Sequence, residues 1–232
     1  MLFNSYEFML FFPIVVIGFF LIPNRCKHIW LLIASYVFYM GWNKLYALLI
    51  FGITIVSYIT AIFIDMSYNT KGKRSCFLAI GISVSLLVLF VFKYYDFGLA
   101  NINAILRKLG QSEIKQHLNL ILPVGISFYT FQAIGYVIDV YRGTTKVEKN
   151  IIRYALFVSF FPQLVAGPIE RSTNLLKQIN NITQIKRFDY KRIVSGLTLM
   201  LYGYFLKMVL ADRLSIFVDC VYSQWDSVGS SE

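Results

Sequence analysis

The chain has 232 residues, of which 57% are hydrophobic and only 15% are charged, and its formal net charge is +10. A soluble domain carries roughly 45–50% apolar and about 25% charged residues, so this composition excludes an ordinary soluble enzyme and indicates a polytopic membrane protein. In a membrane protein, lysine and arginine indicate which loops face the cytoplasm, so we do not interpret the positive charge as a nucleic-acid surface and expect no nucleic-acid partner. The expected fold is all-α: a polytopic bundle of transmembrane helices with a re-entrant segment and an interfacial amphipathic helix.

The apolar segments follow one another with short polar connections. The first has no basic residues before it and no small-residue cleavage site, so we interpret it as a retained span and not as a signal peptide. Its length is about that needed to cross the hydrocarbon core. The predicted spans lie near residues 6–22, 29–42, 45–64, 77–92, 120–140 and 193–211.

Residues 97–119 differ from the spans around them. Apolar residues such as Leu99, Ile102 and Leu106 recur at helical spacing, with polar residues between them. This pattern predicts an amphipathic helix at a membrane interface, ending at Gly110. The span before it is expected to end at residues 93–96.

The stretch FFPQLVAGPIER, residues 160–171, is apolar but contains two prolines. Pro162 lacks a backbone N–H, and Pro168 disfavours helical geometry at Gly167, so both interrupt a helix. One interpretation is a helix end with a basic flank. The other is a re-entrant segment, residues 157–169, that lines a substrate path, because broken backbone at membrane depth is tolerated where it lines a cavity.

The distribution of lysine and arginine favours the re-entrant interpretation. With the N-terminus outside and residues 157–169 re-entrant, most bases lie on the cytoplasmic side, and the outer side keeps only a few. If residues 157–169 crossed fully, the six bases from Arg171 to Arg192 would move outside and the asymmetry would vanish. The bases expected outside are Lys44, Lys93, Arg107, Lys108, Lys115 and Arg213.

Polar residues at or near the proline-containing stretch are the candidates for a substrate tunnel. For each of them, helix packing or a satisfied intramembrane polar group is an equally good explanation. Asp139 with Arg142, and Glu170 with Arg171, are expected to form ion pairs. The tunnel candidates are Gln132, Gln163, Gly167, Pro168, Glu170 and Arg171.

The two histidines, His28 and His117, lie in polar connections, where we expect rings facing solvent or lipid headgroups. The sequence shows no nucleophile elbow, no glycine-rich phosphate loop and no metal-ligand cluster. We therefore predict no catalytic residue and no metal ligand in this chain.

Two long motifs carry a resemblance to a known family. LPVGISFYTFQAIGYVIDVYRG, residues 122–143, and FVSFFPQLVAGPIER, residues 157–171, resemble the signature region of membrane-bound O-acyltransferases. Within that family they resemble the bacterial branch that includes alginate O-acetyltransferase. The resemblance implies a multi-pass enzyme of the plasma (inner) membrane that transfers an acyl group, here acetyl, to a hydroxyl of an exported polysaccharide or cell-envelope polymer. It implies no bound cofactor, and it leaves open whether the donor is acetyl-CoA or an acyl carrier.

The chain also departs from the family pattern. Family members are about twice as long and carry their catalytic histidine in the second half, and neither His28 nor His117 matches that motif. Residues 1–232 are thus expected to be the N-terminal half of the transmembrane domain, inactive alone: a fragment, a truncated product or one piece of a split protein. Expected partners besides the bilayer and the polymer are a C-terminal half or accessory acetylation proteins. The alternative is a non-catalytic scaffold or transporter-like half, because transporters also use broken helices.

Overall fold

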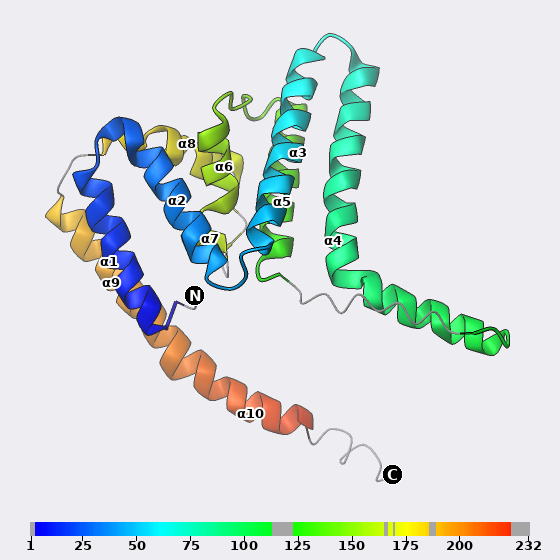
Figure 1. Ribbon diagram of the computed structural model, residues 1–232. Coiled ribbons are helices and arrows are strands. Elements are labelled where there is room, and N and C mark those ends of the chain that lie inside the picture. Colours follow the sequence, from blue (N-terminus) through cyan, green and yellow to red (C-terminus); the bar gives the residue numbers. More distant parts are fainter. Residues whose placement is uncertain (1–2, 113–122, 165–166, 169, 186–188, 224–232) are drawn as a thin grey trace. The chain divides into compact units, whose positions relative to one another are not determined.

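The computed structural model describes residues 3–112, 123–164, 167–168, 170–185 and 189–223. Every regular element in these ranges is helical. Two compact units divide the chain: unit 1 is Leu10–Ile185, and unit 2 combines Leu2–Met9 with Lys186–Glu232. The helices (Figure 1) are α1 (Tyr6–Leu21), α2 (Lys27–Met40), α3 (Tyr46–Met66), α4 (Lys71–Lys108), α5 (Ile126–Arg142), α6 (Ile151–Ser159), α7 (Phe161–Leu164), α8 (Ser172–Asn180), α9 (Tyr190–Phe205) and α10 (Asp212–Ser223), with short 3₁₀ turns η1 (Asn24–Cys26) and η2 (Ile182–Gln184) and a π-helical segment η3 (Leu206–Ala211).

The core of unit 1 lies between α2, α3, α5, α6 and α8. Large aromatic side chains fill it, including the fully buried Tyr39, Tyr136 and Tyr154. Local signals set the helix ends around this core. The side chain of Asn150 accepts hydrogen bonds from two backbone N–H groups at the start of α6, and Gly143, with φ of +76°, terminates α5.

Unit 1 has the polarity expected of a protein surrounded by lipid. Outward-facing side chains on α3 and α4 are large and apolar, such as Leu48, Phe51 and Leu87, while buried ones include Thr54 and Ser57. Three helical stretches of the described chain are long and apolar enough to cross a membrane: Tyr46–Met66, Lys71–Lys108 and Tyr190–Ser223. Apolar side chains outside and hydroxyls inside are typical of helices in a bilayer. The chain is an all-α membrane protein.

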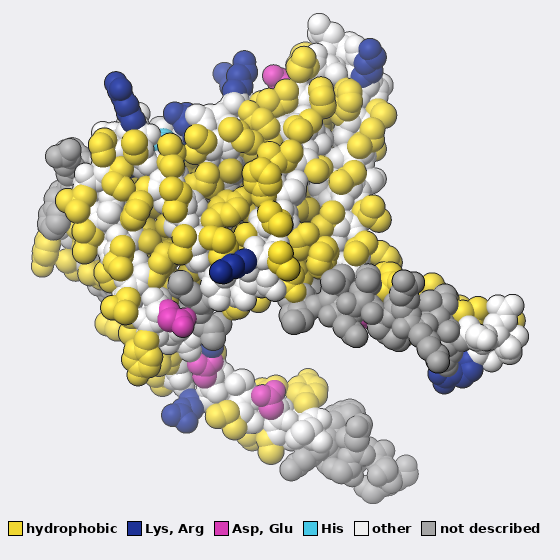
Figure 2. Space-filling model, viewed as in Figure 1, with side chains coloured by type: hydrophobic (Ala, Val, Ile, Leu, Met, Phe, Trp, Pro, Cys, Tyr) yellow, Lys and Arg dark blue, Asp and Glu magenta, His cyan; other side chains and the backbone are white. Residues whose placement is uncertain are grey.

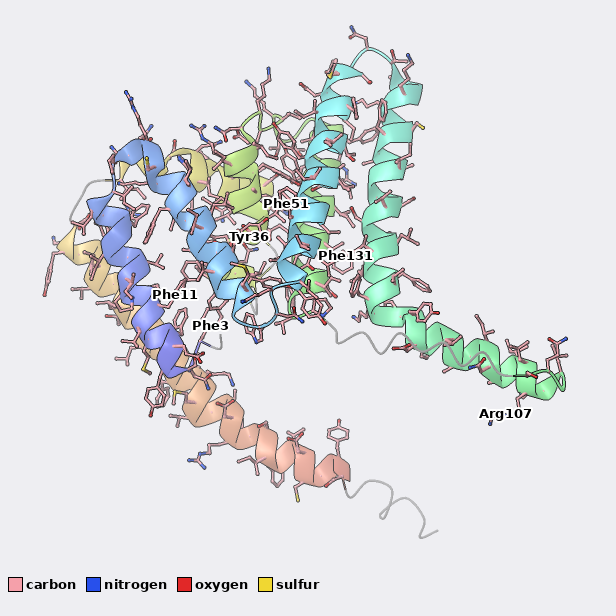
Figure 3. All side chains as sticks on the ribbon, viewed as in Figure 1. Phe3, Phe11, Tyr36, Phe51, Arg107 and Phe131 are labelled. Carbon is pink, nitrogen blue, oxygen red and sulfur yellow. The ribbon has the colours of Figure 1, made fainter. Side chains whose placement is uncertain are left out.

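The predicted boundary at residues 93–96 is wrong, because α4 runs without interruption from Lys71 to Lys108. Polar side chains there do not end the helix, although α4 changes direction along its length (Figure 1). The residues of the predicted amphipathic helix therefore form the last part of α4, which runs at an angle to the first part and carries Arg107 near its end (Figures 1 and 3). The predicted end at Gly110 is confirmed: its φ is +69°, and Gln111 N donates to Leu106 O at 2.9 Å. Residues 113–119, the last part of the segment that differs from the spans, lie outside the described residues.

Other expected boundaries compare closely with the helices. The ranges 29–42 and 45–64 correspond to α2 and α3, which are separated at residues 41–45 as predicted. The range 120–140 begins outside the described residues, and α5 starts at Ile126. After residue 171 the short helix α8 buries Leu175, Leu176 and Ile179.

Unit 2 is formed by the first residues of the chain and by α9, η3 and α10. Its helices follow one another directly, and no side chain described in α9, η3 or α10 is buried. The hydroxyl of Tyr204 donates to the carbonyl of Phe3 at 2.6 Å. This bond joins the two sequence segments of the unit.

Candidate functional site

The helix that starts at Ile151 is broken at Phe160. Its first part, α6, ends at Ser159, Phe160 has ψ of +109°, and α7 resumes at Phe161. In a continuous helix the N–H of Phe161 would donate to the carbonyl of Phe157, and position 162 would donate to Val158. Pro162 has no N–H to give. The break thus frees backbone groups in the middle of the core of unit 1.

Side chains from two other helices satisfy the freed groups. The amide nitrogen of Gln132 on α5 donates to Phe157 O at 2.7 Å. The N–H of Phe161 donates to Ser35 Oγ on α2 at 3.2 Å, and Ser35 in turn donates to Leu31 O. Both side chains are buried. Gln132, expected as a tunnel residue, therefore supports the break, and Ser35 is a partner that sequence reasoning missed, although a lone serine in an apolar helix was a signal for it.

Three further candidates form a tight loop after α7. The amide nitrogen of Gln163 donates to Pro168 O at 2.8 Å, and Gly167 N donates to Gln163 O at 3.0 Å. A Cβ on Gly167 would lie 2.7 Å from the Cα of Gln163, so only glycine fits there. The side-chain oxygen of Gln163 is buried and has no hydrogen-bond partner among the described residues.

The last two candidates lie elsewhere. Glu170 Oε2 accepts from Asn174 at 2.8 Å, and Arg171 is exposed at the start of α8. The predicted ion pair of Glu170 with Arg171 is wrong, because the carboxylate accepts from the side-chain amide of Asn174 on α8. The pair of Asp139 with Arg142 is also wrong.

Asp139 instead accepts a hydrogen bond from Ser172 at 2.7 Å, and Thr145 also lies within hydrogen-bond distance of Ser172. This small polar network fixes the start of α8 against the last turn of α5. The carboxylate thus holds two helices together, which explains why it is not directed toward Arg142.

Contacts between helix ends define a basic end of unit 1. Arg74 at the start of α4 donates to Val140 O at the end of α5, and Asn180 at the end of α8 donates to Glu148. The starts of α2, α4 and α6 and the ends of α3 and α5 therefore meet there, and Figure 2 shows dark blue side chains along this edge. The exposed or half-buried bases of these segments are Arg25, Lys71, Lys73, Arg74, Arg142, Lys146, Lys149, Arg153 and Lys177.

The broken helix leaves this basic end and the chain comes back to it. Asn150, the N-cap of α6, lies at the basic end, whereas Leu164 O lies 2.3 Å from where a Cβ of Gly125 would stand, at the opposite end of α5. Ser172 is again at the basic end, bonded to Asp139. This path supports the re-entrant interpretation of residues 157–169, of which residues 165, 166 and 169 lie outside the described ones. Entry into a membrane from that face stays a prediction.

A cavity of about 330 Å³ lies beside the break, between α1, α2, α7, α8 and η2. Ring contacts of Phe11 with Phe38 and with Phe161 pack α1 against the neighbouring helices on this side (Figure 3). The lining is apolar apart from Gln178. The lining side chains are Phe12, Val15, Val16, Phe19, Phe20, Leu31, Phe160, Phe161, Pro162, Leu175, Gln178, Ile179, Ile182 and Ile185.

His28 is not the solvated ring that its sequence context predicts. It is buried, and its Nε2 lies 2.9 Å from the carbonyl oxygen of Ile179 on α8. A carbonyl only accepts, so Nε2 carries a proton and donates it. This ring holds α2 to α8 and is not placed to take a proton from a substrate through Nε2. His117 lies outside the described residues.

Comparison with known proteins agrees with the two motifs. No model of a known protein family matches the chain, and no solved structure matches it. The probable alginate O-acetylase AlgI of Pseudomonas aeruginosa is 38% identical over 221 residues, which cover 94% of this chain and 41% of the relative. AlgI of Azotobacter vinelandii is 35% identical over 228 residues, with coverage of 97% and 44%. The peptidoglycan O-acetyltransferase of Helicobacter pylori is 32% identical over 249 residues, with coverage of 94% and 46%.

The chain therefore spans less than half the length of these relatives, and the matched region is their N-terminal part. The similarity extends over nearly all of this chain, including both motifs and the broken helix between them. On this evidence, the chain belongs to the membrane-bound O-acyltransferase family.

Proposed function

We propose that this chain is the N-terminal part of an O-acetyltransferase that acts on an exported polysaccharide or another cell-envelope polymer. The acetyl group leaves its donor, an ester bond forms at an acceptor hydroxyl, and the proton of that hydroxyl passes to a general base. The observation that carries the proposal is the broken helix, held open by Gln132 and Ser35, in a chain similar to two kinds of O-acetylase over 94% or more of its length.

Each candidate residue has a role in this proposal. The loop of Gln163, Gly167 and Pro168 forms the tunnel wall, and the free oxygen of Gln163 accepts a hydrogen bond from substrate. Glu170 and Arg171 flank the tunnel mouth at the basic end. Gln132 supports the wall from behind. The general base comes from outside residues 1–232, because Nε2 of His28 is already engaged with backbone.

The test is reconstitution of the chain together with a separate C-terminal half that supplies the general base. The chain is placed in liposomes with acetyl-CoA and alginate, alone and together with a C-terminal half of the Pseudomonas aeruginosa relative, and ester formation is measured. We expect acetylation only with both halves, since a general base contributes typically 10²–10⁴-fold. Activity of the chain alone would contradict the proposal. The full-length relative serves as the active control. If it forms ester and the mixture of the two halves does not, the scaffold or transporter-like alternative is favoured.

We also propose that the protein is a multi-pass protein of the plasma (inner) membrane with its basic end in the cytoplasm. Cysteines placed at Lys149 and at Lys177, after removal of the native cysteines, should both react only with a reagent added inside. These positions lie before and after the broken helix, so labelling of Lys177→Cys from outside would contradict the re-entrant path.

A further inference from the structure

The apolar cavity extends from the break to the basic end of unit 1. Phe161 and Pro162 line it next to the break, and Ile179 and Ile182 line it where α8 and η2 form the basic end. Gln178, the polar side chain of the lining, is exposed. The lining is thus apolar next to the break and includes one exposed polar side chain, Gln178, near the bases.

A buried cation lies beside the cavity. Lys27, the first residue of α2, is 1% exposed, and its ammonium has no hydrogen-bond partner among the described residues. The nitrogen lies over the ring of Phe19, 4.7 Å from the centroid. A cation–π contact offsets only part of the cost of removing an ammonium from water, and buried charges are normally paired. Lys27 is therefore missing an anion.

Phe19 connects the cation to the cavity. The ring of Phe19 contacts the ammonium of Lys27, and the same side chain also lines the cavity. The ring of Phe19 therefore lies between the cation and the cavity. The next residue, His28, bonds to Ile179, a lining residue, so the start of α2 is fixed at this cavity.

We propose that the cavity binds the hydrocarbon tail of an anionic phospholipid, whose phosphate pairs with Lys27 once the Phe19 ring turns aside. The apolar lining fits a tail and offers no partner for a polar solute in its interior. Burying methylene groups there is favourable, and the phosphate supplies the charge that the ammonium lacks. Exposed Arg25, two residues before Lys27 in the chain, favours a headgroup of net negative charge. Lipid binding of this kind is independent of acyl transfer.

The experiment measures lipid binding to the full 232-residue chain, purified in detergent and stripped of lipid. Three probes are titrated: dioleoyl phosphatidylglycerol, dioleoylglycerol with the same tails but no phosphate, and inorganic phosphate. The variants are Lys27→Met, which keeps the length of the side chain, and Lys177→Met, a matched control that removes an exposed lysine beside lining residues. Val16→Trp fills the cavity.

We expect Lys27→Met to weaken phosphatidylglycerol binding about tenfold, the order expected for one charge-assisted bond, and Lys177→Met to leave it nearly unchanged. Dioleoylglycerol should bind both lysine variants and the parent chain equally, and Val16→Trp should weaken both lipids. Without lipid, Lys27→Met should melt at the same or a higher temperature than the parent chain, because it removes an unpaired charge. That result excludes misfolding as the reason for weaker binding.

Other results would overturn the proposal. Equal binding of phosphatidylglycerol to the parent chain and Lys27→Met would show that the phosphate does not reach the lysine. Binding of dioleoylglycerol as tight as that of phosphatidylglycerol would show that the site recognises the tail and not the headgroup. Inorganic phosphate that stabilises the parent chain as much as the lipid does would identify a free-anion site, and a lower melting temperature of lipid-free Lys27→Met would show that Lys27 is already paired.

Discussion

Two places in the described part of the chain interrupt an α-helix, and they are stabilised in different ways. Between α6 and α7 the hydrogen-bond ladder is cut, and Gln132 and Ser35 from other helices satisfy the freed groups. Between α9 and α10 the backbone passes through the π-helical segment η3, where the hydrogen bonds are of the i→i+5 type. The two side chains that satisfy the first interruption, Gln132 and Ser35, are buried, whereas no side chain described in η3 is.

The difference shows which interruption depends on the rest of the fold. A π-helical turn keeps its backbone groups paired along the same helix, so it needs no hydrogen-bond partner from another helix. The break at Phe160 leaves a donor and an acceptor in a buried core, and leaving either unpaired is expensive. The first interruption is therefore preserved by residues distant in sequence, as expected of a feature on which function depends. Four substitutions test this comparison.

The largest effect is expected for Gly125→Val. Gly125 has φ of +78°, and a Cβ there would lie 2.3 Å from Leu164 O, a backbone atom at the end of α7. Left-handed geometry is strained for a β-branched residue, and overpacking adds to that strain, so we expect a loss of at least about 3 kcal/mol of stability. Little folded protein should be recovered by size-exclusion chromatography in detergent. Gly196→Val in α9, where a Cβ meets no atom within 4 Å, is the control and should be recovered normally.

Gln132→Leu should have the next largest effect. It removes the donor to Phe157 O and leaves that carbonyl buried and unpaired, at a cost of about 2 kcal/mol. Thermal unfolding in detergent should show a lower midpoint, and acetyl transfer by the two-half mixture should fall. Gln178→Leu, which changes an exposed glutamine, should do much less. If Gln132→Leu lost activity but kept full stability, Gln132 would contact substrate instead of supporting the break.

Ser35→Ala should cost about 1 kcal/mol, because it leaves the N–H of Phe161 without its acceptor. The effect should be smaller than that of Gln132→Leu, since the bond of 3.2 Å is longer than that of Gln132. The same unfolding measurement checks it, with exposed Ser83→Ala on α4 as control. Equal midpoints for Ser35→Ala and the parent chain would mean that Phe161 does not depend on α2.

The sequence predicted the position of the break but not the residues that support it. Pro162 acts locally on its own helix, so its effect can be predicted from the short stretch of residues 160–171. Ser35 is 126 residues away from Phe161, and only the packing of α2 against α6 and α7 brings them together. His28 was misjudged for the same reason: a polar connection suggests a solvated ring, but α8 folds over it and buries it. The boundary inside α4 failed for another reason, because polarity alone does not interrupt a helical backbone.

The smallest effect is expected for Lys207→Met in η3. Lys207 forms an ion pair with Asp212, and the two side chains are 58% and 42% exposed. Exposed pairs contribute roughly 0–1 kcal/mol, and the π-helical bonds of η3 do not involve either side chain, so the unfolding midpoint should shift by less than it does for Ser35→Ala. Lys207→Met, Asp212→Asn and the double variant together form a double-mutant cycle, which gives the contribution of the ion pair itself. A loss as large as that of Gln132→Leu would show that η3 also relies on side chains, and the contrast between the two interruptions would then fail.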